Sequence, residues 1–173
     1  MGIERRPEPA LLVMGVLSNS EETLYQAESR TRDVFGSIYR KTTPISFERF
    51  TCYYENEMGP GLLRSYWVFS EQTARGTLVE AKLATNRIEK EMSVDGKRTV
   101  NLDPGLLTPE SLVMATTKPY SHRVYLSKGI YAELAIMFKR GGGINPLPWT
   151  YPDYRDPATL DFFSSVRKEV LLS

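Results

Sequence analysis

The chain of 173 residues has very little of two chemically active residue types: one cysteine, Cys52, and one histidine, His122. A lone cysteine excludes an internal disulfide and a cysteine-rich zinc site, and it fits a reducing compartment. A lone histidine excludes a two-histidine metal site and leaves His122 as the only histidine that could activate a serine. Any bound metal would therefore need mostly carboxylate ligands.

Long apolar segments are also absent. The longest apolar run near the start, Ala10 to Leu17, is too short to span a membrane. The residues before it lack the arrangement of a signal peptide with a cleavage site. We therefore expect a cytoplasmic protein with no membrane contact.

An excess of charge of either sign is missing as well. The 22 Lys and Arg residues nearly balance the 21 Asp and Glu residues, and a net charge of +1 does not point to a nucleic-acid partner. The length suits one domain, and the 41% hydrophobic and 25% charged residues are globular proportions. We predict a single domain over residues 1–173: a frayed arm at 1–9, an α+β core at 10–140, and a strap with a closing helix at 141–173.

The first half of the chain predicts a strand and helix alternation. Ala10 to Leu17 is continuously apolar, which is typical of a central strand buried on both faces. Ser18 with Glu21 is a capping-box pattern that opens a helix, and Gly36 ends it. Further elements are strands at 39–50 and 62–69, a helix at 78–92, and a strand at 98–102 closed by the turn Asp103-Pro104-Gly105. This βαββαβ order is the ferredoxin-like sequence of elements, built on an antiparallel-rich sheet.

The second half predicts an extension of this sheet. Thr108 and Pro109 are expected to cap a short helix that runs to about Thr117. A C-terminal β-hairpin then follows, with strands at 122–126 and 130–138 around Ser127-Lys128-Gly129. A glycine-rich flexible break at 141–143, an aromatic strap at 146–155 and a terminal helix at 158–171 complete the prediction.

The polar face of the hairpin is the strongest functional feature. The expected register places Arg123 opposite Glu133 and Tyr125 opposite Tyr131. Arg123 would clamp a phosphate or carboxylate, His122 would shuttle a proton near neutral pH, and Glu133 would orient either. The alternative is an ordinary solvated sheet face with one ion pair.

Four further residues allow two interpretations each. Asp103 would act as a base or simply form its turn, and Lys118 would bind an anion or complement a helix dipole. Lys82 and Asn86 share one helix stripe, which is also typical of a solvated helix surface. Trp149 in the strap would stack on a flat ligand or cover the sheet.

Several short stretches together resemble a known family. They are Glu57-Met58-Gly59-Pro60-Gly61-Leu62, Lys82-Leu83-Ala84-Thr85-Asn86, Asn101-Leu102-Asp103-Pro104-Gly105, Ala115-Thr116-Thr117-Lys118 with His122-Arg123, Gly129-Ile130-Tyr131-Ala132-Glu133 and Pro148-Trp149-Thr150-Tyr151-Pro152-Asp153-Tyr154-Arg155. Over nearly its full length the chain resembles a prokaryotic family of uncharacterised single-domain proteins, a domain of unknown function. The resemblance implies no activity, cofactor or catalytic residue.

Members of that family are sometimes labelled GTP-binding proteins, and the residues test this label. A P-loop needs a glycine-rich turn that ends in Gly-Lys-Ser/Thr between a strand and a helix. The segment 36–42 lacks the second glycine, and Gly141-Gly142-Gly143 has no lysine. The sequence therefore contains no P-loop.

Our leading hypothesis is a site that binds or acts on a small anionic molecule, whether phosphorylated, nucleotide-like or a carboxylate. Its catalytic residues would be His122, Asp103 and Glu133, and its ligand-binding residues Arg123, Lys118, Lys82, Asn86, Tyr131 and Trp149. Whether the protein is an enzyme stays open, and the sequence identifies no cofactor.

One alternative is a non-catalytic module that binds a protein partner or a second copy of itself. Another is a divalent metal site on carboxylates, drawn from Glu55, Glu57, Asp103, Glu133 and Asp153.

Overall fold

The computed structural model describes residues 2–139 and 143–172. Within these ranges nine strands form one antiparallel sheet in the spatial order β2-β4-β1-β5-β6-β8-β7, with β3 beside β4 and β9 beside β8. The strands are β1 (Ala10–Ser18), β2 (Ile38–Lys41), β3 (Ile45–Ser46), β4 (Leu63–Thr73), β5 (Val100–Leu107), β6 (Ser111–Thr116), β7 (Arg123–Ser127), β8 (Ile130–Phe138) and β9 (Ile144–Pro146). The predicted mixture of helices with an antiparallel-rich sheet is confirmed.

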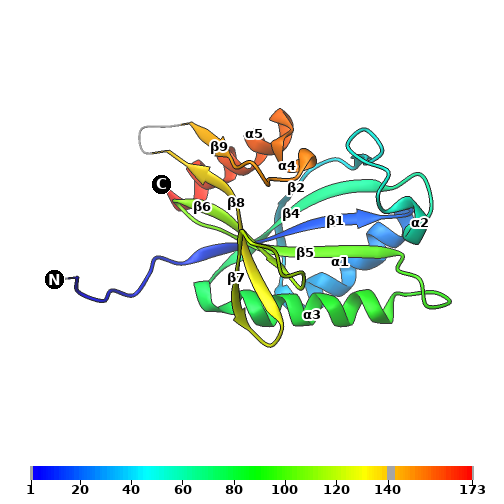
Figure 1. Ribbon diagram of the computed structural model, residues 1–173, viewed down its shortest axis with the longest axis horizontal. Coiled ribbons are helices and arrows are strands. Elements are labelled where there is room, and N and C mark those ends of the chain that lie inside the picture. Colours follow the sequence, from blue (N-terminus) through cyan, green and yellow to red (C-terminus); the bar gives the residue numbers. More distant parts are fainter. Residues whose placement is uncertain (1, 140–142, 173) are drawn as a thin grey trace.

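Helices lie on both faces of this sheet (Figure 1). On one face are α1 (Glu21–Phe35) and α3 (Leu78–Glu91), the latter preceded by the turn η1 (Arg75–Thr77). On the other are α4 (Pro152–Arg155) and α5 (Pro157–Val166), followed by the π-helical turn η2 (Arg167–Leu171). The four-residue α2 (Glu55–Met58) belongs to the long connection between β3 and β4. Residues 2–9 are in no element, and Figure 1 shows them extending away from the body.

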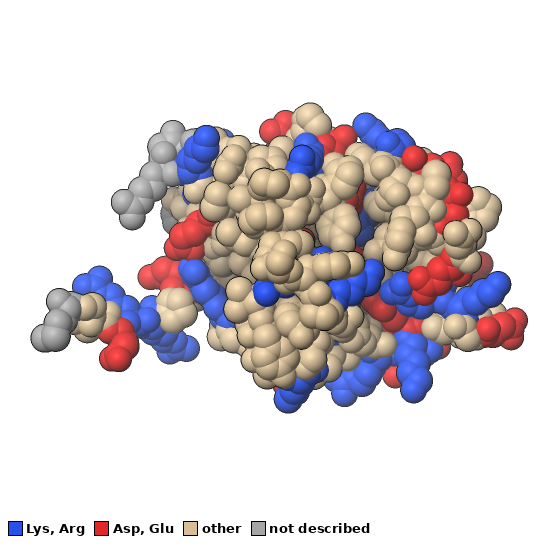
Figure 2. Space-filling view, in the orientation of Figure 1, with Lys and Arg blue, Asp and Glu red and all other residues tan. Residues whose placement is uncertain are grey.

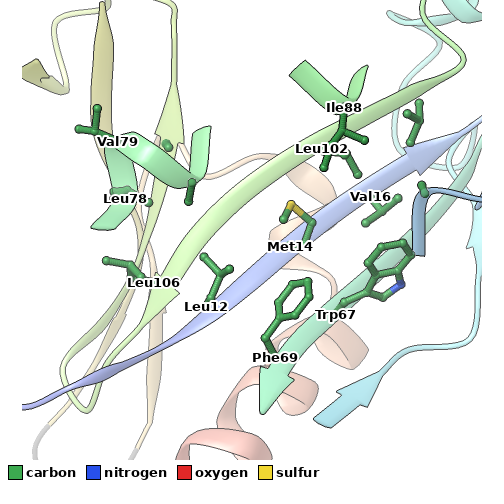
Figure 3. Close-up of a cluster of buried hydrophobic side chains, with 14 of the residues drawn as sticks. Leu12, Met14, Val16, Trp67, Phe69, Leu78, Val79, Ile88, Leu102 and Leu106 are labelled. Carbon is green, nitrogen blue, oxygen red and sulfur yellow. The ribbon is translucent and has the colours of Figure 1, made fainter. Parts of the chain in front are cut away.

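Strand β1 is the centre of the sheet, as its unbroken apolar run predicts. All nine of its residues are buried, and it pairs with β4 on one side and β5 on the other. Because side chains alternate along a strand, Leu12, Met14 and Val16 point to the face covered by α1 and α3. There they join an apolar cluster with side chains of β4, β5 and α3 (Figure 3). Leu11 and Val13 point to the opposite face.

The helix expected between Thr108 and Thr117 is wrong, because this segment is strand β6. The Thr108 hydroxyl does accept hydrogen bonds from the backbone N–H groups of Glu110 and Ser111, at 3.2 and 3.0 Å, as a helix cap would. However, the Thr108 N–H donates to the Ser111 carbonyl at 2.8 Å, which closes a tight turn between β5 and β6. The capping pattern therefore marks a hairpin.

The turn expected at Asp103-Pro104-Gly105 is also wrong, because β5 continues through it to Leu107. Asp103, Pro104 and Gly105 pair in register with Gly15, Met14 and Val13 of β1. Proline is tolerated in a strand when its missing N–H would face away from the paired neighbour. Pairing with β1 thus overrides the local turn signal.

The hairpin of β7 and β8 has the predicted register, with Arg123 opposite Glu133 and Tyr125 opposite Tyr131. Its turn has two residues, not three, because Ser127 pairs with Ile130 and both Lys128 and Gly129 have positive φ. Val124 and Leu126 of β7 are exposed, because β7 is an edge strand.

Two helix ends and one segment complete the comparison with the predictions. The cap of α1 is Ser20, whose hydroxyl accepts from the Thr23 N–H at 3.1 Å, and not Ser18. The predicted stop at Gly36 and the closing helix, present as α5 and η2, are confirmed. Of the expected break, Gly141 and Gly142 lie outside the described residues.

Candidate functional site

The sheet splits between β5 and β6, and the cause is Pro104. The two strands pair only at Gly105, Leu106 and Leu107, opposite Met114, Val113 and Leu112. In the same register the next pair would join Pro104 to Ala115. The Pro104 nitrogen faces this edge and has no hydrogen to donate. Beyond it, β6 keeps its pairing with β8 as far as Thr116, while the edge of β5 is left without a strand partner.

Two side chains of α3 take over the free edge of β5. The Leu102 N–H donates to Glu89 Oε1 at 2.7 Å, and Lys82 Nζ donates to the Leu102 carbonyl at 2.9 Å. Lys82 also lies 3.4 Å from Asp103 and 3.8 Å from Glu89. Burial raises the pKa of Glu89, and the Lys82 ammonium only partly opposes this rise. This helix therefore replaces a strand and holds the split open.

A pocket of about 230 Å³ lies at the split, on the face opposite α1. Its wall includes residues from strands β1, β4, β5, β6, β7 and β8, from helices α3 and α4, and from the connections before β4, β5 and α4 and after β6. The lining residues are Leu17, Phe47, Tyr54, Arg64, Lys82, Asn86, Glu89, Arg98, Asn101, Asp103, Met114, Ala115, Thr116, Thr117, Lys118, Arg123, Glu133, Ala135, Tyr151, Asp153 and Tyr154. Residues far apart in the chain thus meet in one polar pocket.

Arg64 is the central cation of this wall. Its side chain is only 5% exposed and forms an ion pair of 2.8 Å with Asp153, which is 3% exposed. The rings of Phe47, Tyr66 and Tyr154 surround the guanidinium with centroids 4.9 to 5.7 Å away. Burial alone would lower the Arg64 pKa, but Asp153, together with smaller contributions from Tyr66, Tyr154 and Asp103, outweighs it and the pKa is raised. Arg64 is therefore a permanently charged group inside the protein.

Two donors in this wall have no hydrogen-bond partner among the described residues: Arg64 Nε and the Tyr154 hydroxyl, both fully buried. Burial raises the pKa of Tyr154 well above its ordinary value, so its hydroxyl keeps its proton. Both side chains lie against Gly15. A Cβ at position 15 would meet the Tyr154 oxygen at 2.3 Å and Arg64 Nη2 at 3.0 Å. The glycine thus makes room for the Tyr154 hydroxyl and the Arg64 guanidinium.

The Arg123 and Glu133 pair forms a second buried corner. Arg123 Nε donates to Glu133 Oε2 at 2.5 Å, and their side chains are 3% and 5% exposed. Arg123 also donates to the Lys118 carbonyl at 2.9 Å. His122 Nε2 lies 3.2 Å from the same Glu133 oxygen, on the side away from the pocket wall. This corner fixes the loop after β6 to the hairpin.

Two more cations lie at the mouth. Arg98 donates to both carboxylate oxygens of Glu57, at 2.6 and 2.7 Å, which joins α2 to the approach to β5. These bonds lower the pKa of Glu57. Lys118 lies over the Tyr53 ring at 5.6 Å. The connection that carries α2 is thereby held over the pocket from two sides. Figure 2 shows blue and red side chains meeting right of centre on a largely tan face.

The structure brings together six of the nine predicted site residues. Asp103, Glu133, Arg123, Lys118, Lys82 and Asn86 line the pocket. His122, Tyr131 and Trp149 do not. The His122 ring is stacked between Tyr120 and Trp149, and the Trp149 indole donates to the Leu134 carbonyl at 2.9 Å. Tyr131 packs edge-on against Tyr125 further along the hairpin. These three residues support the wall from outside.

The prediction missed Arg64 and Tyr154, the two residues with unsatisfied donors. Arg64 stands in a strand of apolar and aromatic residues, and Gly15 interrupts an apolar run. A cation in a buried strand needs a compensating acid, and a glycine there indicates a close approach of other groups. The two signals together would have pointed to this place.

The part of the chain that the structure describes contains neither a cluster of metal-binding side chains nor a phosphate-binding loop. No group of three or more His, Cys, Asp or Glu residues within 2–139 and 143–172 could hold a metal ion. Residues 36–42 run from the end of α1 into β2, which is not the strand-to-helix setting of a P-loop. Among the described helices, none has the length and apolar character needed to cross a membrane.

Comparison with known proteins gives a family and no activity. Searches of curated proteins and of solved structures found no significant match. A family model described as "Domain of unknown function (DUF4416)" matches residues 8–169, which include the whole pocket wall. The chain therefore belongs to the DUF4416 family of domains of unknown function.

Proposed function

We propose that the pocket at the sheet split binds a small organic anion. The observation that carries this proposal is the pair of unsatisfied donors, Arg64 Nε and the Tyr154 hydroxyl, buried in the pocket wall. A buried donor without an acceptor costs stability, and such groups concentrate at binding sites. An anionic oxygen would satisfy both donors.

The size of the pocket limits the ligand. Pockets that enclose drug-sized ligands have volumes of roughly 300–1,000 Å³. The volume here is about 230 Å³, so the ligand would be smaller. A nucleoside triphosphate would extend well beyond the enclosed space. The size thus favours a simple organic acid or phosphate over the nucleotide that a GTP-binding label suggests.

A thermal unfolding screen tests the proposal. Small carboxylates, phosphates and sugar phosphates would be added to the wild-type protein, to Tyr154→Phe and to the control Tyr25→Phe, whose tyrosine is 74% exposed on α1. An anion at a hundred times its Kd stabilises the folded state by about 2.7 kcal/mol. We expect wild type and Tyr25→Phe to respond alike and Tyr154→Phe to respond less. A screen in which no anion raises the midpoint would refute the proposal.

We also propose that β1 to β5, with α1 and α3, form a ferredoxin-like unit within a single domain. Two features support this: the chain order β1, α1, β2, β4, α3, β5 and the antiparallel spatial order β2-β4-β1-β5.

The lone, exposed Cys52 supports a reducing, cytoplasmic location. Fractionation of the source cells would test the location directly.

A second candidate function, self-association, is favoured by the edge strand β7. Val124, Tyr125 and Leu126 are 66%, 57% and 40% exposed, and the outer edge of β7 ends the sheet. Natural edge strands are usually protected by charges or proline, and these three positions have neither. A second copy of the chain could pair along this edge and cover the three side chains.

Sedimentation analysis over a concentration series separates this candidate from the first. Val124→Lys places a charge on the edge, while Val34→Lys is the matched control on α1, where valine is 54% exposed. Self-association predicts a dimer for the wild type and for Val34→Lys, and a monomer for Val124→Lys. A monomeric wild type at high concentration would rule the edge interface out.

A further inference from the structure

We infer that the ligand is a monocarboxylic acid whose carboxylate binds to the Arg64 guanidinium and the Tyr154 hydroxyl, with an apolar body directed to the other side of the pocket. This inference rests on the proposed anion-binding function and specifies its ligand class.

The number of unsatisfied donors matches a carboxylate. Among the described residues, Arg64 Nε–H and the Tyr154 O–H have no acceptor, and the Arg64 guanidinium and the Tyr154 hydroxyl lie against the same glycine. A carboxylate has two oxygens and would accept one hydrogen bond from each donor. A phosphate has three terminal oxygens and is usually held by backbone N–H groups at a glycine-rich loop or a helix N-terminus. Around Gly15 the donors are instead side chains, Arg64 of β4 and Tyr154 of α4.

The charge of the wall also favours a monoanion over a dianion. The lining contains five cations, Arg64, Lys82, Arg98, Lys118 and Arg123, and four acids, Glu89, Asp103, Glu133 and Asp153. Arg98 is already bonded to both carboxylate oxygens of Glu57, so the other four cations and the four acids balance. A second negative charge on the ligand would therefore add an uncompensated charge to a largely buried site, and that is costly.

The rest of the wall is suited to carbon and hydrogen. Leu17, Phe47, Met114, Ala115 and Ala135 also line the pocket, so its surface is not polar throughout. Apolar area removed from water here would add affinity without a further charge. The pocket volume of about 230 Å³ favours a small body, for which a phenyl ring and a short alkyl chain serve as probes.

Three compounds with the same ring test the head group: benzoate, phenylphosphonate and benzamide. Hexanoate replaces the ring with a chain, and inorganic phosphate removes the body. Binding to the full-length protein would be measured by calorimetry and by thermal unfolding at pH 8, where the phosphonate is largely dianionic. We expect benzoate or hexanoate to bind at least about tenfold more tightly than phenylphosphonate and phosphate. Benzamide should not bind measurably.

The variants locate the head group. Tyr154→Phe keeps the ring and removes one donor, and it should weaken the carboxylate at least about fivefold. Tyr25→Phe should leave its affinity unchanged. Equal carboxylate affinity in wild type and Tyr154→Phe would overturn the assigned position.

The remaining outcomes distinguish a failure of the carboxylate assignment from a failure of the proposed anion-binding function. Phosphonate or phosphate binding as tight as carboxylate binding would overturn the carboxylate assignment and leave anion binding in place. A failure of every carboxylate and every phosphate would overturn both.

Discussion

Strand β1 has two buried faces that are built in different ways. On the face covered by α1 and α3, Leu12, Met14 and Val16 enter a cluster of buried apolar side chains. On the opposite face, Leu11 and Val13 also enter an apolar cluster, but at Gly15 the neighbours are Tyr154 and Arg64, and Arg64 pairs with Asp153. The first face contributes stability throughout, whereas the second contains buried charges and unsatisfied donors.

The two faces therefore differ in how much they contribute to the free energy of unfolding. A buried charge needs its partner, and a buried donor without an acceptor lowers the free energy of unfolding. Natural proteins depart from good packing in this way mainly at functional sites. The contrast between the faces can be tested by substitutions matched across them.

The largest effect should come from Asp153→Asn. This change leaves the Arg64 guanidinium, 5% exposed, without a charged partner. Breaking a buried pair from one side costs about 3–5 kcal/mol, and urea unfolding would measure the loss. The control is Glu91→Gln, which breaks an exposed pair with Arg30 and should cost about 0–1 kcal/mol. Equal losses would mean that the polar face is no more sensitive than the surface.

Truncation of one methionine on each face should give the next largest contrast. Met14 is fully buried in the apolar cluster beneath α1 and α3. Met14→Ala would leave a closed cavity there and lower the free energy of unfolding by about 2–5 kcal/mol. Met114 lines the pocket, so in Met114→Ala the vacated space joins an existing opening. We expect its loss of unfolding free energy to be clearly smaller. If Met114→Ala cost more than Met14→Ala, the pocket would be part of a closed core.

Two tyrosines that pack edge to face, Tyr66 and Tyr154, allow a smaller and more specific test. The Tyr66 hydroxyl donates to Asp153 at 2.8 Å, so Tyr66→Phe should cost about 1.5–3 kcal/mol. The Tyr154 hydroxyl has no partner, and Tyr154→Phe should leave stability unchanged or raise it by about 1 kcal/mol. Unfolding of both variants without ligand measures the difference. A destabilised Tyr154→Phe would show that this hydroxyl already has an acceptor.

The smallest effect concerns pH. Burial raises the pKa of Glu89 above its ordinary value of 4.5, so the folded state holds this proton more firmly than the unfolded state. Stability from this group is therefore lost as the pH rises from 4.5 through the raised pKa. Glu89→Gln does not titrate. Its stability relative to wild type, measured by urea unfolding, should increase as the pH rises from 4.5 through the raised pKa of Glu89. A constant difference would mean that Glu89 ionises normally.

The sequence predicted the elements whose signal is long and periodic. The apolar run of β1, the inner face of α3 and the cross-strand partners Arg123 and Glu133 lie as expected. The errors at Asp103 and Thr108 share one cause, because a local turn or cap signal was outweighed by pairing with a distant strand. Arg123 and Glu133 were found from the hairpin register, and Lys82 and Asn86 from their shared helix stripe. Arg64 and Tyr154 were missed because their role depends on contacts between β4 and α4.

The bond between the Leu102 amide and the Glu89 carboxylate has a consequence for dynamics. Most strand amides exchange their hydrogen with solvent only when two strands separate, which requires a large opening of the sheet. The Leu102 amide is held by a side chain, so rotation of Glu89 alone would release it. Its hydrogen exchange would then report motions of the pocket wall independently of global unfolding. A single backbone amide in the middle of β5 would thus serve as a built-in probe for ligand binding at the split.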